Sequence, residues 1–260
     1  MRITVVAPSE RLAPFVRRFT VIEADVDATR SLLPELGLML GIRFRGAAAS
    51  VAGDRALRLP DATLTGIAGA ARRIHTSAGG AVFAAFHETG AARFFAQPLH
   101  ELFGSTLALD DLAPRVDVER LQDRIAGAPD HLCRIRHLEQ FLLARLRPGR
   151  ADPMADAAVA AIRRMHGALR VAQLARELGI SRRPLEKHFR VAVGTSPKQL
   201  ASLTRLRRVI EGRRAGASWS RLAIEGGYFD QSHFNREFRA MTGESPRHYF
   251  QRDGFCSLPP

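Results

Sequence analysis

Long hydrogen-bonding side chains recur on one face of a predicted helix over residues 182–192. At about 100° per residue, that face carries Arg182, Arg183, Glu186, Lys187 and Arg190. The other face carries Leu185, Phe189 and Ala192, an apolar stripe of the kind that packs against the rest of a domain. Guanidinium and ammonium groups in such a row can neutralise phosphates or donate to acceptor atoms on base edges.

The same arrangement occurs a second time, 49 residues further along the chain. There the outward positions are held by Gln231, Ser232, Asn235, Arg236 and Arg239, and the inward ones by Phe234, Phe238 and Met241. The preceding apolar helix and its glycine repeat as well, because Leu174 and Gly179 correspond to Leu222 and Gly227. A period of this size indicates a duplicated structural unit. Each unit is a helix, a glycine turn and a second helix with one polar face, which predicts two helix-turn-helix motifs.

Two matching polar faces predict double-stranded DNA as the partner, because the major groove admits an α-helix and presents a distinct pattern of donors and acceptors to it. The side chains predicted to contact base edges are Arg183, Glu186, Lys187, Ser232, Asn235 and Arg236. Those predicted to contact phosphates are Arg182, Arg190, Lys198, Gln231 and Arg239. On the helix between the motifs, Arg205, Arg207 and Arg208 either assist in this or are simply solvated.

An all-helical C-terminal region is expected to position these faces. The predicted helices cover residues 156–166, 171–178, 181–192, 197–212, 218–226 and 231–241. Asp156, Ser181 and Asp230 are the predicted N-caps, because their side-chain oxygens can accept from the free amides of a first helical turn. Pro184 falls within a first turn, where its missing N–H has no intrahelical partner to lose.

The first half of the chain has a different pattern. Up to about residue 88, short stretches rich in Val, Ile, Phe and Thr alternate with Gly, Pro and Asp, which predicts an antiparallel barrel or sandwich. The candidate strands are residues 19–24, 36–45, 62–67, 72–75 and 81–87. An apolar stripe of helical period then runs from Leu132 to Leu146, and it either packs on its own domain or pairs with a second subunit. The fold class is therefore α+β, with a mostly-β, barrel-like N-terminal domain with trailing helices and an all-α C-terminal domain.

Prolines and a glycine between residues 147 and 153 predict the domain boundary. The expected division is an N-terminal domain over 1–147, a linker over 148–154, a DNA-binding domain over 155–252 and a tail over 253–260, with helix-turn-helix motifs at 171–192 and 218–241. Residues 151–260 hold 19 Lys and Arg against 10 Asp and Glu, whereas residues 1–150 hold 20 against 16. The C-terminal region thus has most of the positive charge, which favours encounter with a polyanion.

At these residues the chain resembles the AraC/XylS family of bacterial transcription regulators. The resemblance is carried by the stretch G-Y-F-D-Q-S-H-F-N-R-E-F-R over 227–239, by T-G-E-S-P over 242–246, and less tightly by Ser181 to Pro197. It implies two motifs on a rigid linking helix that enter successive major-groove segments. Val209 and Gly212-Arg213 depart from the family pattern, which predicts a weaker C-terminal end of that helix. Residues 83–95 and 98–104 are similar to the sensor half of one branch of the family, which implies an N-terminal domain that binds an effector or pairs subunits.

Catalytic residues, metal and cofactors are not expected. The sequence contains no His-x-His pair, Gly-rich phosphate loop or nucleophile elbow, and Cys133 and Cys256 lack metal or redox spacing. No apolar stretch is long enough to cross a bilayer, so a cytoplasmic protein without a membrane partner is expected. RNA polymerase, a small-molecule effector and a second copy of the chain are possible partners beside DNA.

Two alternatives stay open from the sequence. One is an enzyme whose N-terminal barrel is catalytic and whose DNA-binding tail directs it. The other is an architectural DNA binder without an effector. The first predicts turnover by the N-terminal domain, and the second predicts little preference among DNA sequences, whereas a regulator prefers its site by about 10³-fold or more.

Overall fold

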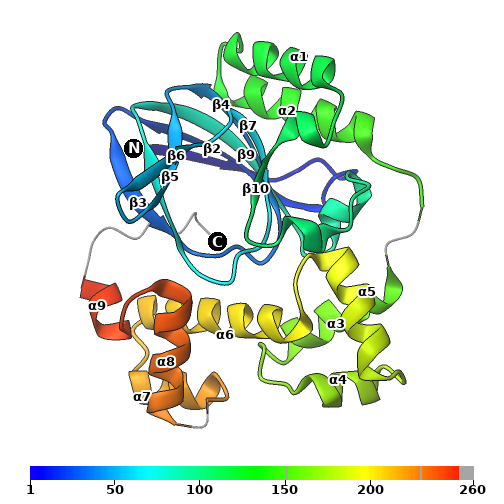
Figure 1. Ribbon diagram of the computed structural model, residues 1–260, viewed down its shortest axis with the longest axis vertical. Helices are drawn as coiled ribbons and strands as arrows, with labels where there is room; N and C mark the ends of the chain where they lie inside the picture. The colour runs from blue at the N-terminus through cyan, green and yellow to red at the C-terminus, as the bar shows by residue number, and fades with distance from the viewer. Residues whose placement is uncertain (150–151, 229, 252–260) are drawn as a thin grey trace.

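The chain has a β-rich N-terminal part and a helical C-terminal part, shown in Figure 1 as a computed structural model. The structure describes residues 1–149, 152–228 and 230–251. The predicted α+β class, with a mostly-β N-terminal domain and an all-α C-terminal domain, is confirmed. The predicted tail, 253–260, lies outside the described residues.

Ten described strands form two antiparallel sheets that face each other, rather than a closed barrel. The larger sheet has the order β1 (Arg2–Val6), β2 (Val16–Ala24), β9 (Gly79–Phe86), β4 (Met39–Arg45), β7 (Ala62–Thr65) and β10 (Thr106–Ala108). The smaller has the order β3 (Ala28–Leu32), β8 (Arg72–Thr76), β5 (Ala48–Ala52) and β6 (Arg55–Arg58). Each of the five predicted strands overlaps an observed one, whereas β1, β3, β5, β6 and β10 were not predicted.

The larger sheet has two different faces, because side chains alternate along each strand. Fully buried Leu40, Val82 and Phe86 belong to the core on one face, where α1 (Arg115–Ala126) and α2 (His131–Arg145) cover the sheet in Figure 1. Met39 and Phe83 belong to the opposite face, which looks toward the smaller sheet and lines a cavity. Short 3-10 helices η1 (Gly90–Arg93), η2 (Leu99–Leu102) and η3 (Leu109–Asp111) connect the strands to α1.

The C-terminal part consists of helices on both sides of one long helix, α6 (Pro197–Arg214). The others are α3 (Pro153–Arg164), α4 (Val171–Glu177), α5 (Arg182–Val193), α7 (Trp219–Glu225), α8 (Gln231–Thr242) and α9 (Pro246–Gln251). The helix α6 continues through Gly212, although a weaker end was predicted there. A Cβ on Gly212 would meet Cδ2 of Leu222 at 2.6 Å, so the glycine lets α7 pack closely against α6.

Two of the three predicted N-caps need correction. The first helix begins at Pro153, and the carboxylate of Asp152, not Asp156, accepts from the amides of Met154 and Ala155. Asp156 instead accepts a hydrogen bond from the hydroxyl of Thr89 at 2.7 Å. Ser181 occupies the N-cap position of α5, but its side chain makes no capping hydrogen bond. The third prediction is right, because Asp230 caps α8 by accepting from the amide of His233.

Candidate nucleic-acid interface and the adjoining cavity

The helices α5 and α8, called the recognition helices below, are each fixed by aromatic side chains on their inner face. Phe189 of α5 is fully buried, and Phe234 and Phe238 of α8 are at most 1% exposed. The rings of Phe234 and Phe238 also contact each other, with centroids 5.7 Å apart. Burying a phenylalanine side chain contributes about 1.5–3 kcal/mol, so the apolar stripe holds each helix with its polar face outward.

The two motifs also repeat at the level of the backbone. Gly179 and Gly227, at the two turns, both have a φ of +66°. Gly194 and Gly243 end the recognition helices in the left-handed region, with φ of +90° and +82°. Because L-residues with a side chain rarely adopt these angles, the glycines fix the same turn and the same helix end in both motifs.

The predicted contact residues lie on the surface. Exposed side chains are those of Arg182, Arg183, Lys187, Arg190, Lys198, Gln231, Ser232, Asn235, Arg236 and Arg239. The exception is Glu186, which is half-buried and accepts a hydrogen bond from Nε of Arg182 at 2.7 Å. Glu186 therefore compensates the charge of a residue on its own helix through one of its two carboxylate oxygens.

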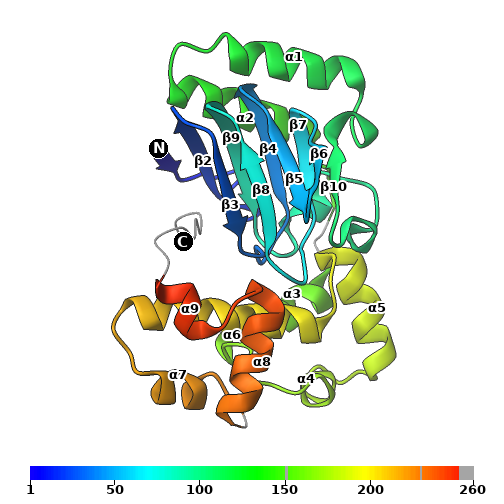
Figure 2. The same cartoon turned by 60° about the vertical axis from the view of Figure 1, so that its left-hand side comes forward.

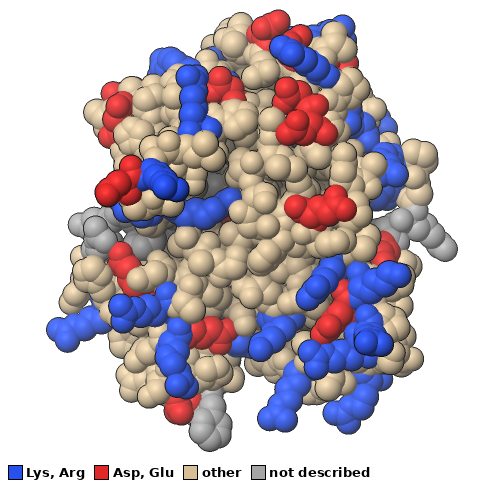
Figure 3. Space-filling model, in the orientation of Figure 1, with Lys and Arg blue, Asp and Glu red and all other residues tan. Residues whose placement is uncertain are grey.

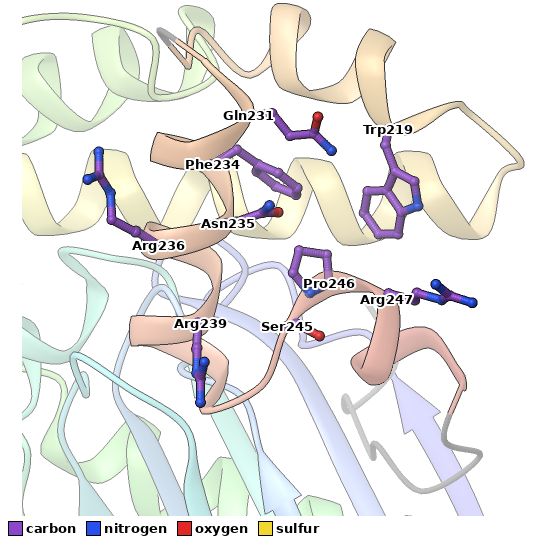
Figure 4. A pocket seen from close by; sticks show the side chains of 9 residues that line it. All are labelled: Trp219, Gln231, Phe234, Asn235, Arg236, Arg239, Ser245, Pro246 and Arg247. Atoms are coloured by element: carbon purple, nitrogen blue, oxygen red, sulfur yellow. The ribbon is translucent and has the colours of Figure 1, made fainter.

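A concave surface accompanies the second recognition helix. Its volume is about 430 Å³, and it lies between α8, Trp219 and the start of α9. In Figure 4 the side chains of Gln231 and Asn235 are on the side of α8 that faces Trp219, whereas Arg236 extends away from Trp219. Arg247, an exposed residue of α9, joins this surface and was not predicted. The sequence did contain a signal for Arg247. It directly follows Pro246, and because proline is favoured at the first position of a helix, the next residue is expected in the first helical turn.

The recognition helices lie at opposite ends of α6. Eighteen residues at about 1.5 Å each make α6 roughly 27 Å long, comparable with one turn of B-DNA, about 34 Å. In Figures 1 and 2 both helices begin at the lower edge, away from the sheets, and run upward toward them. Lys and Arg side chains gather over α5 and around α8 at that lower edge in Figure 3, so both polar faces are open to a polyanion.

Arg205 connects α6 with the second motif. Its Nη2 contacts both carboxylate oxygens of Glu237 at 2.7 and 3.1 Å, and its Nη1 donates to the carbonyl of Gly167. Beside it, burial raises the pKa of Tyr228 to about 12. Arg205 was expected to assist in DNA binding or to be solvated, but its ion pair with Glu237 instead holds α8 against α6.

The N-terminal domain touches both recognition helices at their C-terminal ends. The amide of Ala71 donates to the carbonyl of Met241 in α8 at 2.7 Å. At the end of α5, a Cβ on Gly194 would meet the carbonyl oxygen of Leu99 in η2 at 2.9 Å. The N-terminal ends of both helices are thus free, while their other ends are held by the β-rich domain.

A third contact joins the N-terminal domain to α6 through charge. Glu35 lies 2.7 Å from Arg207 of α6, 3.5 Å from Arg18 and 3.9 Å from Arg17, taken between nitrogen and carboxylate oxygen. Arg207 also donates to the carbonyl of Pro34 at 3.2 Å. Burial lowers the pKa of both Arg17 and Arg18, and the charge of Glu35 opposes that effect. Arg207 is therefore paired with Glu35 and not simply solvated.

A cavity of about 620 Å³ lies between the two sheets and α6. Apolar walls come from both domains: Ile22, Leu32, Met39, Phe83 and Ile74 from the strands, and Ile210 from α6. This volume is within the range of small-molecule sites, about 300–1,000 Å³. The sequence did not predict it, because its lining comes from short stretches scattered along the chain.

The described residues contain no group of three or more His, Cys, Asp or Glu side chains placed to hold a metal ion. Among the helices of the described part, none has the length and hydrophobicity needed to cross a membrane.

Residues 174–252 match the model of a family described as a helix-turn-helix domain. The fold as a whole is similar to that of ToxT from Vibrio cholerae, with a TM-score of 0.51 and 13% identity over 98% of this chain and 100% of ToxT. A DNA-binding transcriptional dual regulator from Escherichia coli K-12 is 29% identical over 38% of this chain and 97% of its own, with a TM-score of 0.34. The C-terminal domain of AraT, a response regulator from Geobacillus stearothermophilus, is 22% identical over 43% of this chain and 94% of its own, with a TM-score of 0.38. No curated protein matches the chain.

Proposed function

We propose that the chain is a DNA-binding transcriptional regulator of the AraC/XylS type, and that α5 and α8 contact successive major-groove segments on one face of DNA. The helix-turn-helix match over residues 174–252 supports this proposal. The observation that carries this proposal is the pair of exposed polar faces at opposite ends of α6, with both N-terminal helix ends open. We keep the predicted base contacts at Arg183, Lys187, Ser232, Asn235 and Arg236. We also keep the interdomain linker from residue 148, but end it before α3, which begins at Pro153 and not after 154 as predicted. For Glu186 we propose orientation of Arg182 toward a phosphate.

The test is selection of bound fragments from genomic DNA with the full chain, followed by mobility-shift titration of the selected site. Arg236→Ala is expected to relax the preference at one site position by about 1–3 kcal/mol. The matched control is Arg221→Ala, an exposed arginine of α7 paired with Glu225, which should leave that preference unchanged. Preference that survives Arg236→Ala would contradict the assignment, and binding without preference would favour the architectural alternative.

We further propose that the cavity between the sheets and α6 binds a small-molecule effector. Because strands and α6 both line it, a ligand would contact both domains and would shift their arrangement according to its differential affinity for the two states. A binding role, not a catalytic one, is proposed for this domain. Turnover of a compound found to occupy the cavity would overturn that choice.

We propose the cytoplasm as the site of action, as expected for a bacterial protein that binds DNA. RNA polymerase and a second copy of the chain stay predictions.

A further inference from the structure

The arginines that line the cavity differ in whether they have a carboxylate partner. Arg207 lies 2.7 Å from Glu35, and Arg43 lies 3.8 Å from Asp61, whereas Arg30 lines the cavity without a carboxylate partner among the described residues. Arg72, on β8, has only a hydroxyl partner among the described residues, since its Nη1 donates to Oγ1 of Thr106 at 3.1 Å. Burial lowers the pKa of Arg72 without an acidic neighbour to raise it. A half-buried cation is therefore left uncompensated beside apolar walls, which is costly unless an anion joins it.

The surroundings of Arg72 suit the head group of a ligand. Thr65 and Thr106 line the same part of the cavity, and their hydroxyl oxygens are 3.2 Å apart. A guanidinium binds carboxylates and phosphates through two parallel hydrogen bonds, and hydroxyls can add further donors. Phe83 and Ile74, from opposite sheets, supply surface for an apolar body beyond the head.

We infer that the cavity takes an organic anion with an apolar body, and that its carboxylate or phosphate is held by Arg72 with Thr106. This inference rests on the proposed effector role of the cavity. It excludes neutral polyols and cations as the ligand class, because neither would compensate Arg72. The α6 arginine, Arg207, is not the anchor, because Glu35 already neutralises it.

The position of Arg72 also connects this anchor with DNA binding. The preceding residue, Ala71, donates its backbone amide to Met241 at the end of α8. An anion that draws Arg72 into the cavity thus acts one residue away from the contact that holds the second recognition helix. Occupancy is expected to change the affinity for DNA.

The experiment compares three ten-carbon probes on the full chain by isothermal titration calorimetry: decanoate, decyl phosphate and decanol. At least one anion is expected to bind about tenfold or more tightly than decanol, as a charge-assisted hydrogen bond would provide. If decanoate binds more tightly than decyl phosphate, the head group of the ligand is assigned as a carboxylate. If decyl phosphate binds more tightly, it is assigned as a phosphate. Arg72→Gln, which keeps a donor for Thr106, should abolish the difference and leave the decanol affinity within about twofold, which also reports that the cavity is folded. The matched control is Arg73→Gln, an exposed neighbour on the same strand, which should keep the difference.

Equal binding of the three probes by the unaltered chain would overturn the inference, and so would a difference that survives Arg72→Gln. Failure of all three probes to bind would overturn it as well. Binding of the selected DNA site, measured in the same preparation without probe, reports separately on the proposed recognition role.

Discussion

Replacing Glu35 with Gln is expected to destabilise the protein by about 3 kcal/mol, at the lower end of the range for a broken buried ion pair. Glu35 is the carboxylate that lies within 4.0 Å of Arg17, Arg18 and Arg207. The Arg18 side chain is 4% exposed, and its three guanidinium nitrogens have no hydrogen-bond partner among the described residues, so its charge would be buried without compensation. Glu35 and Arg207 are 15% and 18% exposed, so water would relieve part of the cost.

The assay is urea unfolding followed by far-UV circular dichroism and by the fluorescence of Trp219, the single tryptophan of the chain, so that both domains are monitored. The matched control is Glu211→Gln, an exposed carboxylate on α6 that lines the same cavity and should change stability by less than about 0.5 kcal/mol. In combination with Arg207→Met, Glu35→Gln should show a coupling of about 1–3 kcal/mol. A loss no larger than that of the control, or no coupling, would refute the assignment of Glu35 as the charge that joins the N-terminal domain to α6.

Three further predictions concern the recognition helices and the residues that hold them in place. Phe238→Ala should cost about 3–5 kcal/mol and lower DNA affinity with it, measured by unfolding and mobility shift, whereas the exposed Val191 should tolerate alanine. Gly194→Ala should destabilise more than Gly243→Ala in thermal unfolding, because both need a left-handed backbone but only Gly194 has a carbonyl within 2.9 Å of the added Cβ; equal losses would contradict the Leu99 contact. Burial raises the pKa of Asp152, but hydrogen bonds from His188 and from the amides of Ala155 and Met154 outweigh this effect, so the pKa is lowered overall. Its stabilisation should therefore be complete above the ordinary carboxyl pKa of about 4 and be lost as pH falls through the lowered value, and Asp152→Asn should remove this part of the pH dependence of Tm.

The duplicated motif could be predicted because all its determinants are local. The turn glycines, the aromatic anchors and the cap at Asp230 lie within a few residues of the helices that they define, so spacing alone placed them. Asp152 also had a local signal, since proline at the next position is typical of a first helical residue. The prediction at Asp156 was wrong because the helix already begins at Pro153.

The missed strand β6 lacked a pattern of its own. All four residues of β6, Arg55–Arg58, are exposed, so no buried face imposed an alternation on the sequence. This strand exists through its pairing with β5, from Ala49 opposite Arg58 to Ala52 opposite Arg55. Such pairing depends on the neighbouring strand and not on the propensity of the segment itself.

The charged contacts of α6 could not be predicted from the local sequence either, but for a different reason. On a helical wheel Arg205 and Arg207 look like any solvated arginines, and only the fold brings Glu237 and Glu35 beside them. Both arginines fix α6, one to the second recognition helix and the other to the wall of the cavity. The helix that spaces the two recognition helices is thus the same element that a cavity ligand would touch.

This arrangement favours regulation by orientation over regulation by occlusion. Occlusion would require the N-terminal domain to cover the polar faces of the recognition helices, yet the predicted contact residues other than Glu186 are exposed. The domain instead holds the C-terminal ends, through Ala71 at Met241 and Leu99 at Gly194, and holds α6 through Glu35. Small displacements at these three points would alter the angle and separation of two helices that, as proposed above, enter adjacent grooves together. Since both must fit at once, a modest change in their geometry is sufficient to change DNA affinity without unfolding either motif.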